Sequence, residues 1–168
     1  MHDEILDLVD NNDNVIAQIS RNVVWQKNIV NFRAINAFIE NDQGQLWIPR
    51  RTAHKQRWPL ALDVSIGGCV AAGESYEQAF AREALEEVNI DINKVPHTFV
   101  TYLSPYTHNV AAFMHVYTLK LNTVPTYNTD DFCEHFWLTP QEVLARIRDG
   151  EPCKGDLPEL LKIVYGLI

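Results

Sequence analysis

Three glutamates in one short stretch of this chain have a spacing that could hold a metal ion. Glu83, Glu86 and Glu87 occupy positions i, i+3 and i+4, which lie on one face of an α-helix. Like charges at this spacing repel one another, so a cation is expected beside them. Oxygen ligands from one helix suit Mg²⁺ or Mn²⁺, which complete their coordination with waters and substrate phosphates. The stretch therefore predicts a divalent-cation site for phosphate chemistry.

The residues around these glutamates follow a regular spacing. Gly68 is separated by five residues from Glu74, and seven further residues lead to the adjacent pair Arg82-Glu83. The glycine allows a tight turn before the helix, and its carbonyl is a further candidate metal ligand. Residues 74–87 hold five glutamates against one arginine and carry half of the net charge of −8. This charge argues against nucleic-acid binding, which needs a basic face.

The elements before this stretch are predicted to be short strands joined by turns. Residues 10–14 are Asp and Asn, and residues 40–44 hold a similar polar run that ends in glycine. Both runs favour turns, so two hairpins are predicted. Residues 61–66 have the pattern of a short buried strand that leads into Gly67-Gly68. The strands of the two hairpins are expected at residues 5–9, 15–20, 32–39 and 45–49.

From Ser75 onward the apolar spacing changes to that of a helix over residues 75–88. Ser75 is its predicted N-cap, and the glutamates lie opposite the core face. A second helix begins at Thr139-Pro140 and ends at 149–150, and a third begins near 157. Further strands are expected at 98–103, 111–121 and 135–138. The core face of the first helix is predicted to consist of Ala81, Ala84, Leu85 and Val88, and the core elsewhere of Leu6, Val15, Ile35, Phe38, Ile48, Leu62, Val64, Val116, Leu138 and Leu144.

The composition excludes several classes of protein. With 168 residues, 46% hydrophobic and 21% charged, the chain matches one globular α/β domain spanning residues 1–168. Apolar runs stay well short of the ~18 residues of a membrane helix, and residues 1–20 are too acidic for a secretion signal. The three cysteines lack the CxxC spacing of a zinc site or a disulfide framework. We therefore expect a cytoplasmic location and no membrane partner.

The segment from Gly68 to Ile90 resembles the Nudix box, whose pattern is G-x5-E-x7-R-E-U-x-E-E-x-G-U with U a bulky apolar residue. Six fixed positions of the pattern agree, and Ile90 fills the last apolar position. Ala84 is small where a bulky residue is usual, and Asn89 replaces the last glycine. Asparagine tolerates the left-handed conformation, so the turn that ends the helix can survive. The six fixed positions are Gly68, Glu74, Arg82, Glu83, Glu86 and Glu87.

The resemblance extends to both sides of the box, over roughly residues 1 to 165. The flanking segments are similar to the Nudix branch that includes isopentenyl diphosphate isomerase and its hydrolase-like bacterial relatives. The resemblance implies an α/β/α sandwich around a mixed β-sheet, with residues 68–90 as the box. Residues 1–30 would form an N-terminal β-hairpin extension, which could support a homodimer.

The family pattern also implies roles for individual residues. Glu83, Glu86 and Glu87 would ligate Mg²⁺ or Mn²⁺ together with Gly68, and Glu83 is also a possible base. Glu74 would support this cluster, and Arg82 would pair with acidic groups. A second catalytic acid is expected before Trp137, where Glu134 and Asp131 match best. The reaction implied is attack of a metal-activated water on a diphosphate.

Substrate contacts are expected outside the box. The most basic stretch of this acidic chain precedes the box, and its side chains are candidates to bind substrate phosphates or to remain solvated. Aromatic side chains are candidates to stack on a base or to pack in the core. The basic candidates are Arg50, Arg51, Lys55 and Arg57. The aromatic candidates are Trp58, Trp25, Tyr102, Tyr106 and Phe113.

These observations predict a Mg²⁺-dependent hydrolase of a nucleoside di- or triphosphate or a related nucleoside diphosphate derivative. One alternative is an isopentenyl diphosphate isomerase-like enzyme, but that enzyme needs a cysteine and histidines that residues 63–68 lack. A second alternative is a non-catalytic binding module with the same fold. The presence of all the acidic box residues favours the enzyme.

Overall fold

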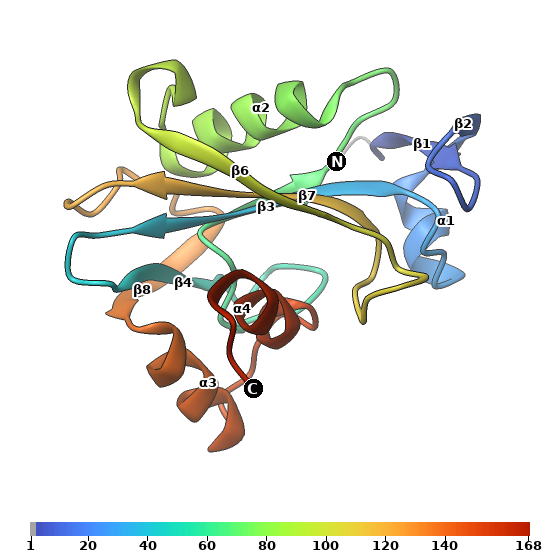
Figure 1. Cartoon of the computed structure of the whole chain (residues 1–168). Helices are drawn as coiled ribbons and strands as arrows, with labels where there is room; N and C mark the ends of the chain where they lie inside the picture. The colour runs from blue at the N-terminus through green and yellow to red at the C-terminus, as the bar shows by residue number, and fades with distance from the viewer. Residues whose placement is uncertain (1–2) are drawn as a thin grey trace.

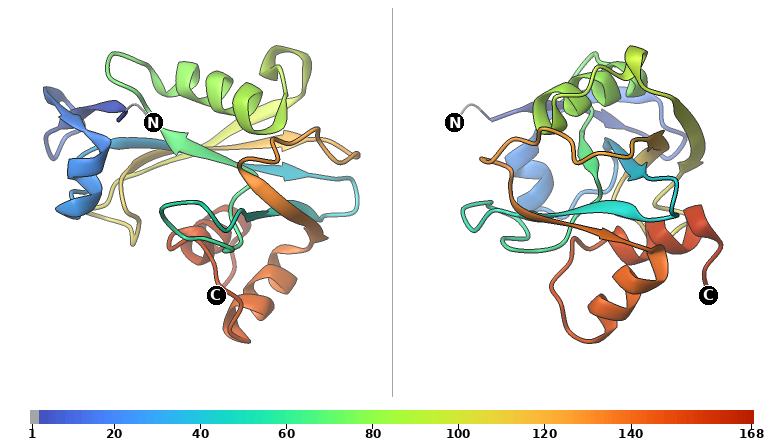
Figure 2. Two further views of the ribbon diagram at one scale, coloured as in Figure 1. Left: turned by 180° about the vertical axis from the view of Figure 1, so that it is seen from behind. Right: turned by 90° about the vertical axis from the view of Figure 1, so that its left-hand side faces the viewer.

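The fold, obtained as a computed structural model that describes residues 3–168, has a mixed β-sheet between two layers of helix. Helix α2 (Tyr76–Val88) covers one face of the sheet, and α3 (Pro140–Arg148) and α4 (Leu157–Tyr165) lie below the other face (Figure 1). Seen from behind, the same three layers are visible (Figure 2). This is the α/β/α sandwich that the sequence predicts. Among the described residues, no helix combines the length and the apolar character needed to cross a membrane.

The strands form one large sheet and one separate hairpin. The order in the large sheet is β6-β7-β3-β4-β8, with β5 paired to β3, and β1 pairs with β2 alone. The strands are β1 Ile5–Val9, β2 Val15–Ser20, β3 Arg33–Glu40, β4 Leu46–Arg51, β5 Ile66–Cys69, β6 His97–Leu103, β7 Phe113–Lys120 and β8 Phe132–Leu138. The remaining helices are α1 Arg21–Gln26 and the 3₁₀ turn η1 Ile92–Lys94. The pairing of β3 with β7 is parallel and all other strand pairs are antiparallel, so the sheet is mixed.

The second predicted hairpin exists only at its turn. β3 and β4 pair at Glu40 and Leu46, and then β4 leaves to pair with β8. The reason lies in the two edges of β3. β7 occupies one edge along its whole length, and β5 occupies the other edge from Ala34 to Ala37. A partner strand in hairpin register would need the place that β5 fills.

Strand β3 shows how the sheet divides two hydrophobic cores. Its successive side chains point to opposite faces. Ile35 and Ile39 pack with the apolar face of α2, whereas Ala34 and Phe38 pack with the side of α3 and α4. The strand is therefore buried on both faces, as is typical of a central strand with a parallel neighbour.

Helix α2 begins and ends as the sequence predicts. The Ser75 hydroxyl accepts from the Gln78 amide and the Gln78 side chain accepts from Ser75, which forms a capping box. Asn89 ends the helix in the left-handed conformation, with φ of 54°. The predicted burial of Leu85 was wrong, because this side chain is 56% exposed. The buried face consists instead of Tyr76, Ala79, Phe80, Ala84 and Val88, so Leu85 lies about 100° away from Ala84.

Two further sequence predictions differ from the structure. Residues 61–66 are buried as predicted, but the strand begins at Ile66, because the backbone groups of Leu62 and Asp63 bond to Pro152 and Pro49 and not to one partner strand. Val15 was predicted in the core and is exposed, since β2 belongs to the separate hairpin and its first four residues are all exposed. Leu144 is half-buried. The short helix α1 was missed, and its cap residue Ser20 makes no side-chain capping bond that would mark it.

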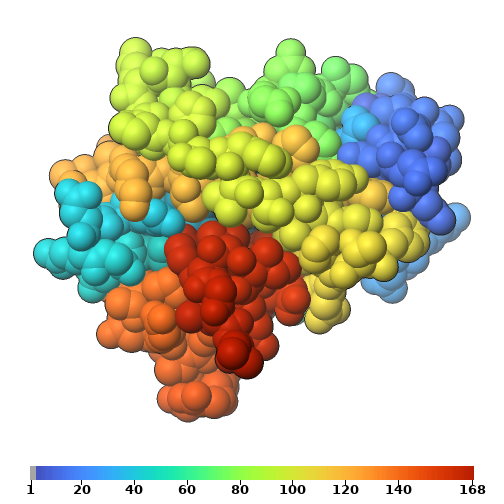
Figure 3. Space-filling model, viewed as in Figure 1, coloured from blue at the N-terminus to red at the C-terminus, as the bar shows by residue number. Residues whose placement is uncertain are grey.

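The N-terminal hairpin packs at one end of the molecule, next to α2 (blue in Figure 3). Asp13 lies in the turn between β1 and β2 and connects this hairpin to the main sheet and to α2. The Asp13 carboxylate accepts from Arg33 Nε at 2.6 Å and from the Tyr76 hydroxyl at 2.8 Å. The Tyr102 hydroxyl donates to the same carboxylate at 3.3 Å. One side chain thus joins three elements to the extension.

Replacement of Asp13 by asparagine is expected to loosen this hairpin. The substitution keeps a residue that tolerates φ of 64° but removes the charge that Arg33 and Tyr76 bind. Hydrogen bonds to a charged group contribute about 1.5–3 kcal/mol, so we expect a loss of that size in the free energy of unfolding. Urea denaturation measures it, and hydrogen exchange should rise selectively in residues 5–20. The control is Asp10→Asn, because Asp10 bonds within its own turn; an equal loss there would contradict the role of Asp13.

Candidate active site

Two adjacent glycines of β5 form the floor of the site. At Gly68 an added Cβ would lie 2.8 Å from Glu83 Cγ and closer still to the Glu83 carboxylate. The Gly67 amide donates a hydrogen bond of 2.9 Å to Glu87 Oε2. The carboxylates of Glu83 and Glu87 therefore reach from α2 to neighbouring residues of one strand. Only a residue without a side chain leaves room for Glu83 in this position.

Arg82 binds most of the other acidic residues of the box. Its guanidinium donates to both Glu74 oxygens at 2.9 Å and to the Cys69 carbonyl at 3.0 Å. It also donates to Glu83 at 2.7 Å and, more weakly, to Glu86 at 3.4 Å. Burial alone would raise the pKa of Glu74, but the bonds from Arg82 outweigh it and hold that pKa below its usual value. Arg82 thus ties the loop before α2 to the helix.

Burial disfavours the charged forms of Glu83 and Glu87 more than their hydrogen-bond partners favour them. Burial raises the pKa of Glu83 to about 7 in spite of Arg82, and Glu86 and Glu4 add to the effect. Burial and the charge of Glu83 raise the pKa of Glu87 well above its usual value. Two buried carboxylates that disfavour each other's charge are the environment in which a divalent cation is stabilising.

The oxygen atoms of the box residues are suitable ligands for a hard cation. Their side chains are not arranged around a common point in this structure. Within residues 3–168, no three His, Cys, Asp or Glu side chains are arranged to close around a metal ion. The reason is Arg82, which lies between Glu74, Glu83 and Glu86 as their counter-charge. Glu86 is mostly exposed and free to turn. A cation at Glu83 and Glu87 would be bound by carboxylate oxygens, the ligands that Mg²⁺ and Mn²⁺ prefer.

The two candidates for a second acid lie in different surroundings. Glu134 is half-exposed and bonds to Arg50 Nε at 2.7 Å. Arg50 also binds Glu151 and stacks over Phe136, on the side of the sheet covered by α3 and α4. Asp131 is close enough to Glu87 to raise its pKa, although burial and Glu83 have larger effects. The charge of Asp131 therefore acts on a carboxylate of the box, whereas the contact of Glu134 is with Arg50.

The four basic residues predicted to bind phosphate also have different surroundings. Arg50 is bound by Glu134 and Glu151, and Arg51 donates to Asp63 at 2.6 Å. Lys55 pairs with Asp131. Arg57 is exposed and lies over the ring of Trp25, 5.4 Å from its centroid. Of the four basic residues, three are held by carboxylates, and Arg57 is the most available.

Trp58 is the most informative of the aromatic candidates. It is exposed, adopts a left-handed backbone with φ of 55°, and packs against Gly155, where an added Cβ would lie 3.1 Å from its ring. Trp25 is half-buried beneath Arg57 and Arg21. Phe113 is buried in the core, and Tyr102 and Tyr106 are exposed. Only Phe113 has a purely structural position.

Asp63 is a buried acid that the sequence analysis did not identify as important. Its carboxylate pairs with Arg51 at 2.6 Å and with Lys154 at 3.6 Å. Burial favours the neutral form, but Lys154 and Arg51 outweigh it and hold the pKa of Asp63 below its usual value. A charged residue inside the otherwise apolar stretch 61–66 was the available signal. The sequence contains no corresponding signal for Lys154, because this residue is far from Asp63 in sequence.

This ion pair predicts a specific acid sensitivity. Because the pKa of Asp63 is lower in the folded than in the unfolded state, its stabilisation is present above the unfolded pKa of about 4. It is lost as the pH falls through the folded pKa. Asp63→Asn should therefore show a smaller decrease in urea midpoint between about pH 6 and pH 3 than the unmodified protein. Exposed Asp149→Asn is the control; an unchanged acid dependence in Asp63→Asn would contradict the assignment.

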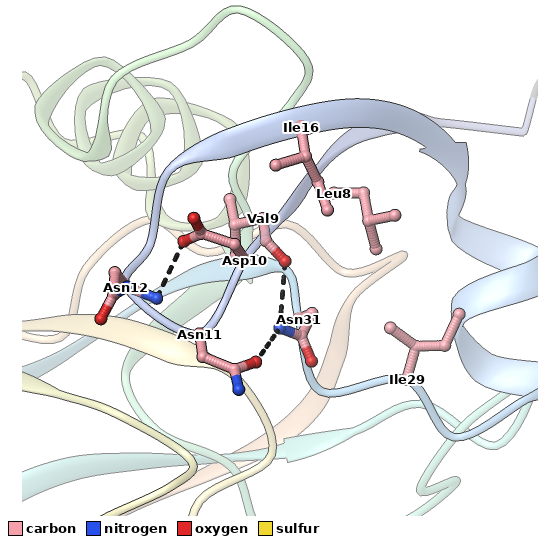
Figure 4. A pocket seen from close by; sticks show the side chains of 8 residues that line it. All are labelled: Leu8, Val9, Asp10, Asn11, Asn12, Ile16, Ile29 and Asn31. Atoms are coloured by element: carbon pink, nitrogen blue, oxygen red, sulfur yellow. Dashed lines mark hydrogen bonds between the residues drawn. The ribbon is translucent and has the colours of Figure 1, made fainter.

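A hollow in the surface lies elsewhere. It has a volume of about 590 Å³ and lies at the N-terminal hairpin, between Ile16 and Ile29 (Figure 4). Asn31 bonds to the Val9 carbonyl and to Asn11 along its rim. None of its lining residues is a predicted site residue, so the hollow and the acidic box are separate features.

Comparison with known proteins agrees with the fold and the box. The NUDIX domain model matches residues 30–157. The Nudix hydrolase all7351 of Nostoc sp. is 48% identical over 162 residues, which cover 96% of each chain. A Nudix hydrolase of Deinococcus radiodurans is 46% identical over 166 residues, 97% of this chain and 95% of that protein. The chain therefore belongs to the Nudix family, and by its similarity to these relatives it is a Nudix hydrolase.

Solved structures agree on the fold. The crystal structure of DR0079 from Deinococcus radiodurans superposes with a TM-score of 0.91 at 45% identity, covering 96% of this chain and 99% of that one. The Escherichia coli dihydroneopterin triphosphate pyrophosphohydrolase superposes with a TM-score of 0.58 at 16% identity, covering 80% and 95%, which shows similarity of fold alone. Members of the family generally use divalent cations and act on small nucleotides.

Proposed function

We propose that this Nudix hydrolase cleaves a phosphoanhydride bond of a nucleoside di- or triphosphate, or of a related nucleoside diphosphate derivative, with Mg²⁺ or Mn²⁺. The observation that carries the proposal is the convergence of Glu83 and Glu87 on Gly67-Gly68. Burial raises the pKa values of both carboxylates. Such a pair of carboxylates suits metal-assisted hydrolysis.

In this proposal some residues of the box bind the cation and others hold the structure of the site. Glu83 and Glu87 hold the cation, with Glu86 and the Gly68 carbonyl as further oxygen ligands. Glu74 and Arg82 fix the loop and the helix relative to each other. A divalent cation held by these residues would supply Lewis-acid polarisation of a phosphoryl oxygen and a lower pKa for the attacking water. Catalysis then depends mainly on position and electrostatics, because phosphoryl transfer needs little covalent chemistry from the protein.

The proton of the attacking water needs an acceptor. As the water oxygen bonds to phosphorus, the bond from phosphorus to the bridging oxygen breaks and the leaving phosphate departs. Asp131 and Glu134 are each paired with a basic side chain, Lys55 and Arg50 respectively. We propose Asp131 as the second acid because its charge acts on Glu87. Glu83 is the other possible acceptor. Arg57 and Trp58, both exposed, are proposed to contact the substrate.

The alternatives have less support. The isomerase reading needs a cysteine and histidines in the segment 63–68, which is instead an aspartate, a serine and apolar or glycine residues. A non-catalytic binding module would be expected to have lost residues of the box. Here Glu74, Arg82 and Glu83 are present and connected by hydrogen bonds. We also propose that residues 1–168 form one Nudix domain in the cytoplasm, with residues 1–30 as its extension.

The test is a release assay for phosphate and pyrophosphate over nucleoside di- and triphosphates, dinucleotide polyphosphates, nucleotide sugars and isopentenyl diphosphate. Each substrate is assayed with Mg²⁺ and with EDTA. Turnover of one nucleotide class that needs the metal supports the proposal and identifies the substrate. If no compound of the panel is hydrolysed although Mg²⁺ is shown to bind, the isomerase or the binding module would be favoured.

The N-terminal hairpin is also proposed to support a homodimer. It is separate from the main sheet, and its outer strand exposes Val15 and Ile16. Sedimentation velocity over a range of concentrations tests this, and a monomer at every concentration would exclude it.

A further inference from the structure

Lys154 lies beside the glycines of the site although it is distant from the box in sequence. Its Nζ is 3.2 Å from Asn36 Oδ1, and Asn36 is a buried residue of β3. An added Cβ at Gly67 would lie 3.1 Å from the same Nζ. The amide of Gly67 holds Glu87. Gly67 therefore has the Lys154 ammonium on the face of β5 opposite Glu83, while its backbone amide donates to Glu87, a carboxylate of the proposed metal site.

The backbone around Lys154 is held in place. The Lys154 amide donates to the Leu62 carbonyl at 2.8 Å, and the Leu62 amide donates to the Pro152 carbonyl at 2.8 Å. Leu62 is fully buried, so these bonds fix the loop against the core. Gly155 packs beneath the ring of Trp58. A side chain on such a backbone needs little ordering when it meets a ligand.

Lys154 makes a longer contact with a carboxylate than Arg50, Arg51 and Lys55, the paired basic residues before the box. Arg51 has the shorter contact with Asp63, at 2.6 Å, whereas Lys154 is 3.6 Å from the other carboxylate oxygen. The partner of Lys154 at hydrogen-bond distance is the neutral amide of Asn36. An ammonium has three donors. Among residues 3–168 these two contacts are the polar contacts of its Nζ, so a donor remains available although the charge also stabilises Asp63.

We propose that Lys154 binds a phosphate oxygen of the substrate, which makes it a substrate-binding residue of the site formed by the box. The inference rests on the proposed function, because it takes a diphosphate as the ligand. A compact ammonium suits a phosphate as a point charge. Its place beside Gly67, whose amide donates to Glu87, brings that charge to the strand that carries the proposed metal site.

The first test uses the unmodified protein and methylenediphosphonate, a diphosphate that cannot be hydrolysed. Lysines are acetylated with and without this probe in the presence of Mg²⁺, and each site is quantified by mass spectrometry. We expect at least about threefold protection of Lys154, since bound phosphate occupies the ammonium. Lys94, which is 80% exposed and paired with Asp91, is the control that should not change. Equal acetylation of Lys154 in both samples would overturn the proposal.

The second test separates binding from folding. Lys154→Met is expected to raise KM for the nucleotide about 10- to 100-fold, the range of one hydrogen bond to a charged group. Lys154→Arg should recover most of this loss, because it restores the charge. A role limited to pairing with Asp63 would lower the melting temperature and leave KM unchanged. That outcome, in a folded variant, would also overturn the proposal.

The two proposals can fail separately. If the unmodified protein hydrolyses none of the nucleotides with Mg²⁺, the proposed function fails whatever Lys154 does. If it hydrolyses one of them while Lys154 is neither protected nor needed for KM, the inference about Lys154 alone is wrong. Should Lys154→Met fail to fold, the protection experiment decides.

Discussion

Glu87→Gln is expected to lower metal-dependent hydrolysis by at least about 100-fold without loss of the fold. Substitutions of residues that merely support a metal ligand typically cost 10–100-fold, so loss of a ligand should exceed that range. Burial and the charge of Glu83 raise the pKa of Glu87, which means that the charged carboxylate is unfavourable in the metal-free fold. A neutral amide of the same shape should therefore be tolerated.

The measurements are kcat with the nucleotide found in the panel, and the melting temperature with and without Mg²⁺. A ligand that binds the folded state raises the melting temperature, so the unmodified protein should be stabilised by Mg²⁺ and Glu87→Gln much less. Glu77→Gln is the matched control, because Glu77 is 70% exposed on the same helix. Glu83→Gln is expected to behave like Glu87→Gln.

Full activity in Glu87→Gln would show that hydrolysis does not depend on the box. Loss of activity together with a lower melting temperature in the absence of metal would show a structural role for Glu87 instead. The expected pattern is different from both, since activity and the response to Mg²⁺ are lost while the metal-free protein is as stable as before.

The box could be predicted from the sequence because its information is local. Helical spacing alone places Glu83 and Glu87 on one face, and Ser75 and Asn89 mark the ends of the helix through their own backbone preferences. The structure confirms these ends. Local signals also identified the capping box of Thr139 and Glu142.

Features that depend on distant contacts were not predictable in this way. The sequence around residues 40–44 is that of a hairpin, and the turn exists, but β5 takes the place beside β3. Asp131 and Glu134 could not be distinguished by their distance from Trp137, because their partners, Lys55 and Arg50, are distant in sequence. Lys154 approaches Gly67 only through the loop that pairs with Leu62.

Gly68→Ala is expected to abolish most activity and to leave the protein folded. Its new Cβ would lie 2.8 Å from Glu83 Cγ and closer to the carboxylate. The group displaced is the end of a flexible side chain, so the fold can adapt by moving Glu83. A ligand moved away from the site should cost at least about 100-fold in kcat, or roughly 2.7 kcal/mol. The expected change in unfolding free energy is below about 1 kcal/mol.

Gly67→Ala is the matched variant, because it places the same methyl group one residue earlier on the opposite face of β5. There the new Cβ would lie 2.8 Å from Val64 Cγ2 and 3.2 Å from Asn36 Oδ1, both of them buried, and 3.1 Å from Lys154 Nζ, the proposed phosphate ligand. Packed neighbours cannot move away cheaply, so a loss of about 1–3 kcal/mol in stability is expected. Urea denaturation and kcat, measured on both variants, distinguish the two faces of the strand.

The two alanine variants test whether the position of Glu83 matters for hydrolysis. If Gly68→Ala keeps normal turnover and its stabilisation by Mg²⁺, the carboxylate of Glu83 is not needed where the structure places it. If Gly68→Ala loses both and is as stable as the unmodified protein, the glycine serves the site and not the fold. The absence of a side chain at Gly68 would then be as necessary for hydrolysis as the carboxylate that occupies its place.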